Sequence, residues 1–156
     1  MKVTSTLVLS LALLTPAISA VAAHPIAPMN CPAPESITWE GNHFTAPVTQ
    51  EGWQGSWNSS IHAQSTVKKF TNALYFAKKG LSEGVLVNCT YALSNGKEID
   101  LTYSLQGEEK KLSNLIVSID DAAVWIPESN SRLERFYDCD KSAQECKFNA
   151  INVVYQ

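Results

Sequence analysis

Apolar and polar side chains alternate over residues 85–93 and again over residues 99–105, and this alternation constrains the fold more than any other feature. A period of two is typical of a β-strand that buries one face and exposes the other. The two runs are separated by Asn95-Gly96, a dipeptide that favours the tight turn of a β-hairpin. The sequence therefore predicts two antiparallel strands joined by a short loop.

The length of that loop decides which side chains share a face. A two-residue turn at Asn95-Gly96 would pair Tyr91 with Asp100 and place an acid on the apolar face. A three-residue loop over 95–97 avoids this, because a slip of one residue turns every side chain to the other face. We therefore predict a bulged hairpin with an odd-length loop. The predicted pairs are Leu93 with Ile99, Tyr91 with Leu101 and Cys89 with Tyr103.

Further segments have the residue types and spacing of short strands. They are 37–39, 53–57, 112–119, 123–126, 133–139 and 148–155. Residues 65–80 are ambiguous, because Val67, Phe70 and Leu74 have helical spacing whereas Leu74 and Phe76 alternate with other residues. The β-favouring residue types in this segment favour a strand.

Many short strands with regular turn signals predict an all-β domain over residues 37–156, a small antiparallel sandwich or barrel with two disulfides. Residues 24–36 contain four prolines and are expected to form an extended lead-in.

The first 23 residues have the organisation of a cleavable signal peptide. Lys2 supplies a positive n-region, residues 7–14 form a short apolar core, and residues 16–23 end in small side chains. The apolar run is too short to span a bilayer, which takes ~20 residues. No later segment is long and apolar enough, so we expect a periplasmic or secreted protein without membrane insertion after cleavage.

Cleavage after Ala23 removes 23 of the 156 residues and leaves 133, the size of one ordinary domain. The loss of Lys2 lowers the 12 basic residues to 11 against 15 acidic ones, and the net charge from −3 to −4. A mildly acidic domain lacks the electrostatic footprint of a nucleic-acid-binding protein. We therefore expect no nucleic-acid partner.

The four cysteines, an even number in an exported chain, predict two disulfides with three connectivities open. Cys139 and Cys146 have a spacing that suits a local bridge across a turn, which leaves Cys31 to pair with Cys89. The absence of a Cys-x-x-Cys pair argues against a thioredoxin-like site or a zinc knuckle.

Several short motifs follow the signal peptide in a fixed order. They are Cys31-Pro32, Gly52-Trp53 with Trp57, Phe70-x-x-Ala73, Val87-Asn88-Cys89-Thr90-Tyr91 and Cys146-Lys147-Phe148. This order resembles a group of small exported bacterial proteins known only as domains of unknown function, over nearly the whole mature chain. The resemblance implies a periplasmic or secreted β protein and assigns no activity or catalytic residue.

One metal site is conceivable. If cleavage makes His24 the mature N-terminus, its amino group and ring would suit copper, with His43 or His62 as the second imidazole. This arrangement resembles the histidine brace of copper monooxygenases and of some periplasmic copper carriers. Three isolated histidines are not a spaced ligand motif, so we favour no metal and no other cofactor.

Trp53 and Trp57 lie four residues apart, so on a strand they would share one face. Exposed, the two indoles would make a platform for a sugar ring or a partner peptide; buried, they would belong to the core. The chain has no nucleophile elbow, no His-Glu-x-x-His and no glycine-rich phosphate loop.

These observations favour an exported, disulfide-stabilised, non-catalytic binding domain for a protein or glycan partner, with Trp53 and Trp57 as the candidate partner surface. Two alternatives stay open. One is a copper-binding protein or enzyme that uses His24, and the other is a secreted hydrolase inhibitor.

Overall fold

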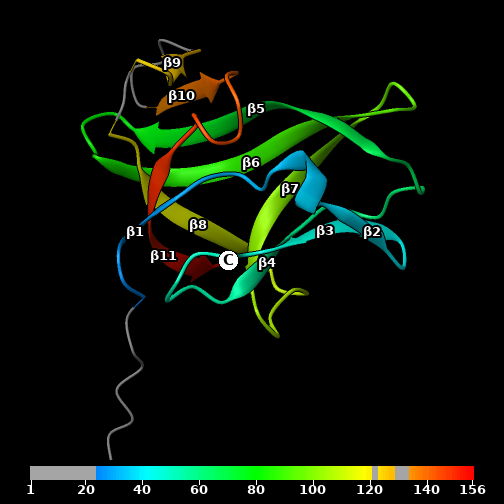
Figure 1. The fold of residues 1–156 in the computed structure, drawn as a ribbon. Coiled ribbons are helices and arrows are strands. Elements are labelled where there is room, and N and C mark those ends of the chain that lie inside the picture. The colour runs from blue at the N-terminus through cyan, green and yellow to red at the C-terminus, as the bar shows by residue number, and fades with distance from the viewer. Residues whose placement is uncertain (1–23, 121–122, 129–133) are drawn as a thin grey trace, which may run out of the picture.

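The computed structural model describes residues 24–120, 123–128 and 134–156, and these are mainly β-structure (Figure 1). A short 3-10 helix, η1 (Pro34–Ser36), interrupts a series of eleven strands. The strands are β1 (Ala27–Met29), β2 (Thr38–Glu40), β3 (His43–Pro47), β4 (Gly55–Asn58), β5 (Val67–Lys78), β6 (Glu83–Leu93), β7 (Glu98–Leu105), β8 (Ser113–Ser118), β9 (Ile126–Pro127), β10 (Glu134–Cys139) and β11 (Phe148–Tyr155). The predicted signal peptide, residues 1–23, lies outside the described residues. None of the helical structure in the described ranges is long and apolar enough to cross a membrane.

The strands pair antiparallel throughout and form one curled sheet whose central strand is β6. β5 pairs with one edge of β6, and β7 and β8 share the other edge. β8 pairs with Glu83–Leu86 of β6 and β7 pairs with Cys89–Ala92, so the sheet forks between these two segments. One branch runs from β8 through β11 to β1, and the other from β7 through β4 and β3 to β2. The all-β antiparallel prediction is confirmed, as a sheet curled into a half-barrel.

Both disulfides join the pairs that the spacing favoured. Cys31 is bonded to Cys89, with 5.9 Å between the Cα atoms, and Cys139 is bonded to Cys146, with 5.7 Å. All four cysteines are buried. The first bridge fastens the segment before η1 to the middle of β6, and the second closes the connection from β10 to β11.

The hairpin of β6 and β7 has an odd-length loop, as predicted, but a different register. Tyr91 lies opposite Ile99 and Cys89 opposite Leu101, two residues away from the predicted pairs. The loop consists of residues 94–96, closed by a hydrogen bond of 2.8 Å from the Leu93 N–H to the Lys97 carbonyl. Such a loop needs a left-handed residue in its last position, and Gly96, with φ of 83°, fills it. A shift of two residues keeps each side chain on the same face of the sheet. The predicted faces of Tyr91 and Cys89 are therefore correct.

The ambiguous segment 65–80 is a strand, β5, as favoured from its residue types. Its register against β6 shifts at three places, between Val67 and Lys69, between Phe70 and Asn72, and at Leu74. The first two shifts insert an extra residue into β5 and break its alternation, whereas the third inserts Val87 into β6. This explains why the segment also fits a helical spacing.

Two strands were not anticipated, β3 and β1. β1 lies within the predicted lead-in, pairs with β11 and buries Ala27 and Met29. Its Pro28 is compatible with this place, because an edge strand tolerates a residue without an N–H. The predicted strand 123–126 is reduced to Ile126 and Pro127, and the predicted start at Leu133 lies outside the described residues.

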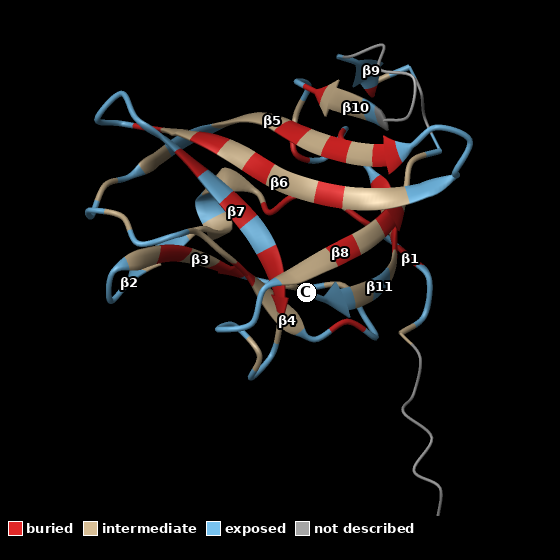
Figure 2. Cartoon of the chain, turned by 180° about the vertical axis from the view of Figure 1, so that it is seen from behind, coloured by how far each residue is buried: buried red, intermediate tan, exposed pale blue. Residues whose placement is uncertain are grey.

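The core lies inside the curl of the sheet. Figure 2 shows that buried residues alternate with half-buried ones along β5, β6 and β8, whereas on β7 they alternate with exposed ones. A bulge between Leu86 and Asn88 buries Leu86 and turns Val85 outward, against the predicted alternation of residues 85–93. The largest fully buried side chains are Trp125, Tyr91, Phe44, Phe148 and Leu101.

Candidate functional site

Trp53 holds the N-terminal segment against the sheet. Its side chain is 3% exposed, its Nε1 donates a hydrogen bond of 2.8 Å to the Pro25 carbonyl, and the His24 ring stacks on it at 4.7 Å between ring centroids. Gly52 permits this contact, because a Cβ there would lie 2.6 Å from the Pro25 ring. Trp53 is therefore occupied by the chain's own residues.

Trp57 faces the core from β4. It is 2% exposed and meets Tyr103 and Phe148 edge to face, at 5.7 and 6.5 Å between ring centroids. The interpretation of Trp53 and Trp57 as a partner surface is thus wrong, and their alternative interpretation as core residues accounts for both. Trp57 points inward from β4, whereas Trp53 lies in the loop before β4 and is buried against the N-terminal segment.

The three histidines do not converge. His43 begins β3, and His62 lies at the same end, because its N–H donates 2.8 Å to the carbonyl of Asn42. His24 stacks on Trp53, which lies in the loop after the opposite end of β3. The two ends of β3 are four residues apart, a distance of ~13 Å along the strand. Within the described ranges, no three His, Cys, Asp or Glu residues are placed to hold a metal ion. The copper hypothesis has no second imidazole beside His24.

Two of the core tyrosines, Tyr91 and Tyr103, are structural hydrogen-bond donors. The Tyr91 hydroxyl donates 2.6 Å to the Pro32 carbonyl, and that of Tyr103 donates 2.8 Å to Gln54. Burial raises the pKa of Tyr103 and of Tyr75 to about 12, and the pKa of Tyr91 further. All three are protonated at neutral pH and are unsuited to act as bases there.

A cleft of about 550 Å³ lies at the fork of the sheet, where β7 and β8 separate from β6. Leu86, Tyr103 and Leu115 come from the core and line its base. Its polar walls include Asn58, Asp100, Thr102, Ser113, Asn114 and Gln156. Neither the fork nor this cleft is visible in the sequence, because both follow from two strands sharing one edge of β6.

Hydrogen bonds within the protein orient the cleft walls. Asn58 accepts a bond of 2.9 Å from the Thr45 hydroxyl and donates one of 2.8 Å to the Ser56 hydroxyl. Asp100 accepts a bond of 2.7 Å from Thr90. On the opposite wall, Gln156 donates 3.2 Å to Asn114. These polar groups are held in place without a ligand.

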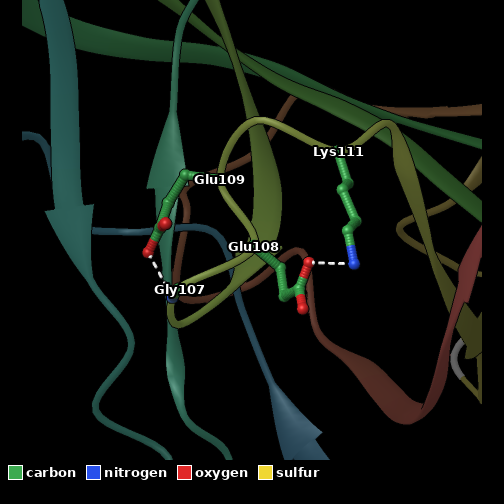
Figure 3. Close-up of polar contacts among 4 residues, drawn as sticks. All are labelled: Gly107, Glu108, Glu109 and Lys111. Atoms are coloured by element: carbon green, nitrogen blue, oxygen red, sulfur yellow. Dashed lines mark hydrogen bonds and ion pairs between the residues drawn. The ribbon is translucent and has the colours of Figure 1, made fainter.

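The loop from β7 to β8 contributes Glu109, Lys111 and Leu112 to the lining of the cleft, and Figure 3 shows the polar contacts within this loop. In this loop Lys111 pairs with Glu108 at 2.6 Å, and this contact raises the pKa of Lys111. Glu109 accepts a bond of 2.8 Å from the Gly107 N–H, and backbone hydrogen bonds lower its pKa. Lys111, the one lysine among the described residues that line the cleft, is thus matched by Glu108, whereas the lining also includes the carboxylates of Asp100 and Glu109.

A second surface lies on the outside of the sheet, which we call the outer apolar face: Leu74, Phe76, Val85, Ile116 and Phe136. The register places Phe136, Phe76, Val85 and Ile116 side by side on four strands, β10, β5, β6 and β8. The rings of Phe76 and Phe136 are 5.0 Å apart. All five side chains are half-buried, and within the described ranges none of them packs against the core.

The outside of β3, β4 and β7 is polar. Thr45, Asn58 and Thr102 lie side by side there, followed on β7 by Asp100. The outer surface of the sheet is therefore apolar over β10, β5, β6 and β8 and polar on the branch of β7, β4 and β3. Sequence reasoning missed the outer apolar face because the bulges in β5 and β6 change which residues point outward.

The fold and its two buried disulfides define a disulfide-stabilised all-β domain of the kind that persists in oxidising compartments. A family model described as a protein of unknown function (DUF3757) matches residues 24–149, and the chain belongs to this family. The resemblance to an uncharacterised family is thereby confirmed. Neither a curated protein nor a solved structure matches the chain.

Proposed function

We propose that this protein is an exported binding domain that captures a protein partner through the outer apolar face. The observation that carries the proposal is the row of Phe136, Phe76, Val85 and Ile116, apolar side chains that have no role in the core. A contiguous apolar patch on the surface of a soluble domain marks an interaction site.

The shape of the face favours a protein over a small ligand. Four neighbouring strands at a spacing of ~4.8 Å make a row roughly 14 Å wide. The paired rings of Phe76 and Phe136 supply the aromatic anchor that protein interfaces concentrate near their centre.

Polar groups surround the row, as they do in protein interfaces. Exposed Lys78 and Glu83 lie two positions further along β5 and β6, beyond Phe76 and Val85. Asp138, two positions from Phe136 on β10, is held by a hydrogen bond from Asn72. The predicted signal peptide and the disulfides support an exported location for this surface.

A photo-crosslinking residue at Phe76 tests the proposal, with the same residue at Glu98 as the matched control, because Glu98 is an exposed position of β7 that does not belong to the outer apolar face or to the cleft. We expect the Phe76 position to crosslink one defined protein from the envelope or the medium and the Glu98 position to leave it uncaptured. Equal crosslinking at both positions, or none at Phe76, would contradict the proposal.

Substitution supplies the second arm. Phe76→Ser with Phe136→Ser should lower capture of the crosslinked partner at least tenfold, while Glu98→Gln should leave it unchanged. Since both phenylalanines lie outside the core, circular dichroism and the melting temperature should show a folded protein. If the partner is an exported hydrolase, its activity assay shows whether this domain inhibits it.

A further inference from the structure

The cleft at the fork has the features of a second binding site. We infer that it binds a neutral, hydroxyl-rich ligand, that is, a carbohydrate. The inference does not depend on the proposed function, because none of the five residues of the outer apolar face lines the cleft.

Size and position suit a small ligand. A volume of about 550 Å³ falls within the ~300–1,000 Å³ of ligand pockets. The base is lined by Leu86, Tyr103 and Leu115, which are buried in the core. The packing of the core therefore forms the base of the cleft before a ligand binds.

The wall chemistry matches sugar hydroxyls. A hydroxyl both donates and accepts, so it needs donors and acceptors within short reach. Asn58, Asn114 and Gln156 provide amides, Thr102 and Ser113 provide hydroxyls, and Asp100 provides a carboxylate.

The walls are also fixed in advance. The internal bonds from Thr45 to Asn58 and from Thr90 to Asp100 hold two of these groups on one wall. A carboxylate oxygen accepts more than one hydrogen bond, so Asp100 keeps capacity for a ligand. Pre-ordered side chains reduce the entropy lost on binding.

Charge selects against anions. Asp100 and Glu109 are both at the cleft, and the charge of Lys111 is matched by its contact with Glu108. A phosphate or carboxylate would therefore meet net negative charge. A neutral ligand does not.

An apolar contact completes the site. Leu112 lines the cleft and is 74% exposed, and Val87 lines it from β6. The C–H faces of a sugar ring are apolar, so these two side chains can cover one face while the walls bind the hydroxyls.

Titration of the full chain with four named trisaccharides tests the inference. Maltotriose, cellotriose and tri-N-acetylchitotriose are neutral, and sialyllactose is anionic. Amide chemical shifts, followed by calorimetry, report binding. We expect at least one neutral sugar to shift the amides of Asp100, Thr102 and Asn114, and sialyllactose to leave them unchanged.

Two variants assign the binding to the cleft. Asp100→Asn removes the charged acceptor and Thr102→Val removes a hydroxyl, and each should weaken binding about tenfold, because each removes a hydrogen-bonding group from the cleft wall. Glu98→Gln is the matched control, because Glu98 is an exposed acid on β7, two residues before Asp100, and does not line the cleft. It should leave binding unchanged.

The inference is overturned if none of the three neutral sugars binds, if only sialyllactose binds, or if Asp100→Asn and Glu98→Gln weaken binding equally. Crosslinking at Phe76 is unaffected by any of these results, so the two proposals fail separately.

Discussion

Cys31–Cys89 and Cys139–Cys146 lie in the same layer of the core but close very different loops. Ala73 on β5 pairs with Cys89 on one side and with Cys139 on the other, and all three residues are fully buried. The sequence separation is 58 residues for the first bridge and 7 for the second. Because the surroundings are matched, the two bridges differ mainly in the entropy that each removes from the unfolded chain.

The loops also differ in what else holds them. The short loop has its own turn, in which Ser142 donates to the Glu145 carboxylate through its N–H and its hydroxyl, at 3.1 and 2.7 Å. The long loop depends on contacts with distant residues, such as Tyr91 to Pro32. The first bridge therefore constrains a long stretch of chain, whereas the second closes a turn that also has its own hydrogen bonds.

The largest effect should come from removal of the long-range bridge. In the double variant Cys31→Ser with Cys89→Ser, we expect the free energy of unfolding to fall by about 4 kcal/mol, from the entropy of a loop of this length. Denaturant unfolding measures the loss, and hydrogen exchange should rise in β1. If removal of the long-range bridge lowered the free energy of unfolding no more than removal of the local bridge, the two bridges would not differ as loop length predicts.

Removal of the local bridge should cost less. The entropy of its loop gives about 2.5 kcal/mol for Cys139→Ser with Cys146→Ser, and the Ser142–Glu145 turn should retain part of the local order. Denaturant unfolding under the same conditions gives a direct ratio of the two losses. Increased hydrogen exchange confined to residues 139–148 is the expected signature, and an increase in β1 would contradict it.

A hydrogen bond beside the long-range bridge, from Tyr91 to Pro32, also holds the N-terminal segment against the sheet. Tyr91→Phe removes the donor of the 2.6 Å bond to the Pro32 carbonyl and leaves a buried acceptor unpaired, which costs ~1–3 kcal/mol. Tyr75→Phe is the matched control, because within the described residues the Tyr75 hydroxyl has no hydrogen bond, and we expect a smaller loss. An equal loss of unfolding free energy in the two variants would show that the Tyr91 hydrogen bond does not help to hold the N-terminal segment.

How far the sequence predicts the structure follows from the range of the interactions. The pairing of Cys139 with Cys146 is local, and it leaves one partner for Cys31, so spacing alone sufficed. The odd-length loop after Leu93 followed from parity, but its register depended on which residue takes the left-handed conformation, and Gly96 does.

The candidate sites were beyond such reasoning. Trp53 and Trp57 have the composition of a platform, and only the packing of Pro25 and Tyr103 against them shows that they are buried. Val85 faces outward because of a bulge, which leaves no mark in the sequence. The cleft requires that β7 and β8 share one edge of β6, a long-range feature of the topology.

The smallest effect concerns a residue on the strand between the two bridges. Thr71 lies at a bulge of β5, two residues before Ala73, and its buried hydroxyl has no hydrogen-bond partner among the described residues. Thr71→Val replaces this hydroxyl with a methyl group of similar shape. Because the folded state then no longer buries an unsatisfied group, we expect a gain of about 0.5 kcal/mol in the free energy of unfolding. The gain should be the same in both double-serine variants if the two bridges differ only in loop length, because Thr71 belongs to neither bridge. A gain that disappears in only one of them would show that this bridge shapes the bulge, and the two bridges would then differ in more than loop length.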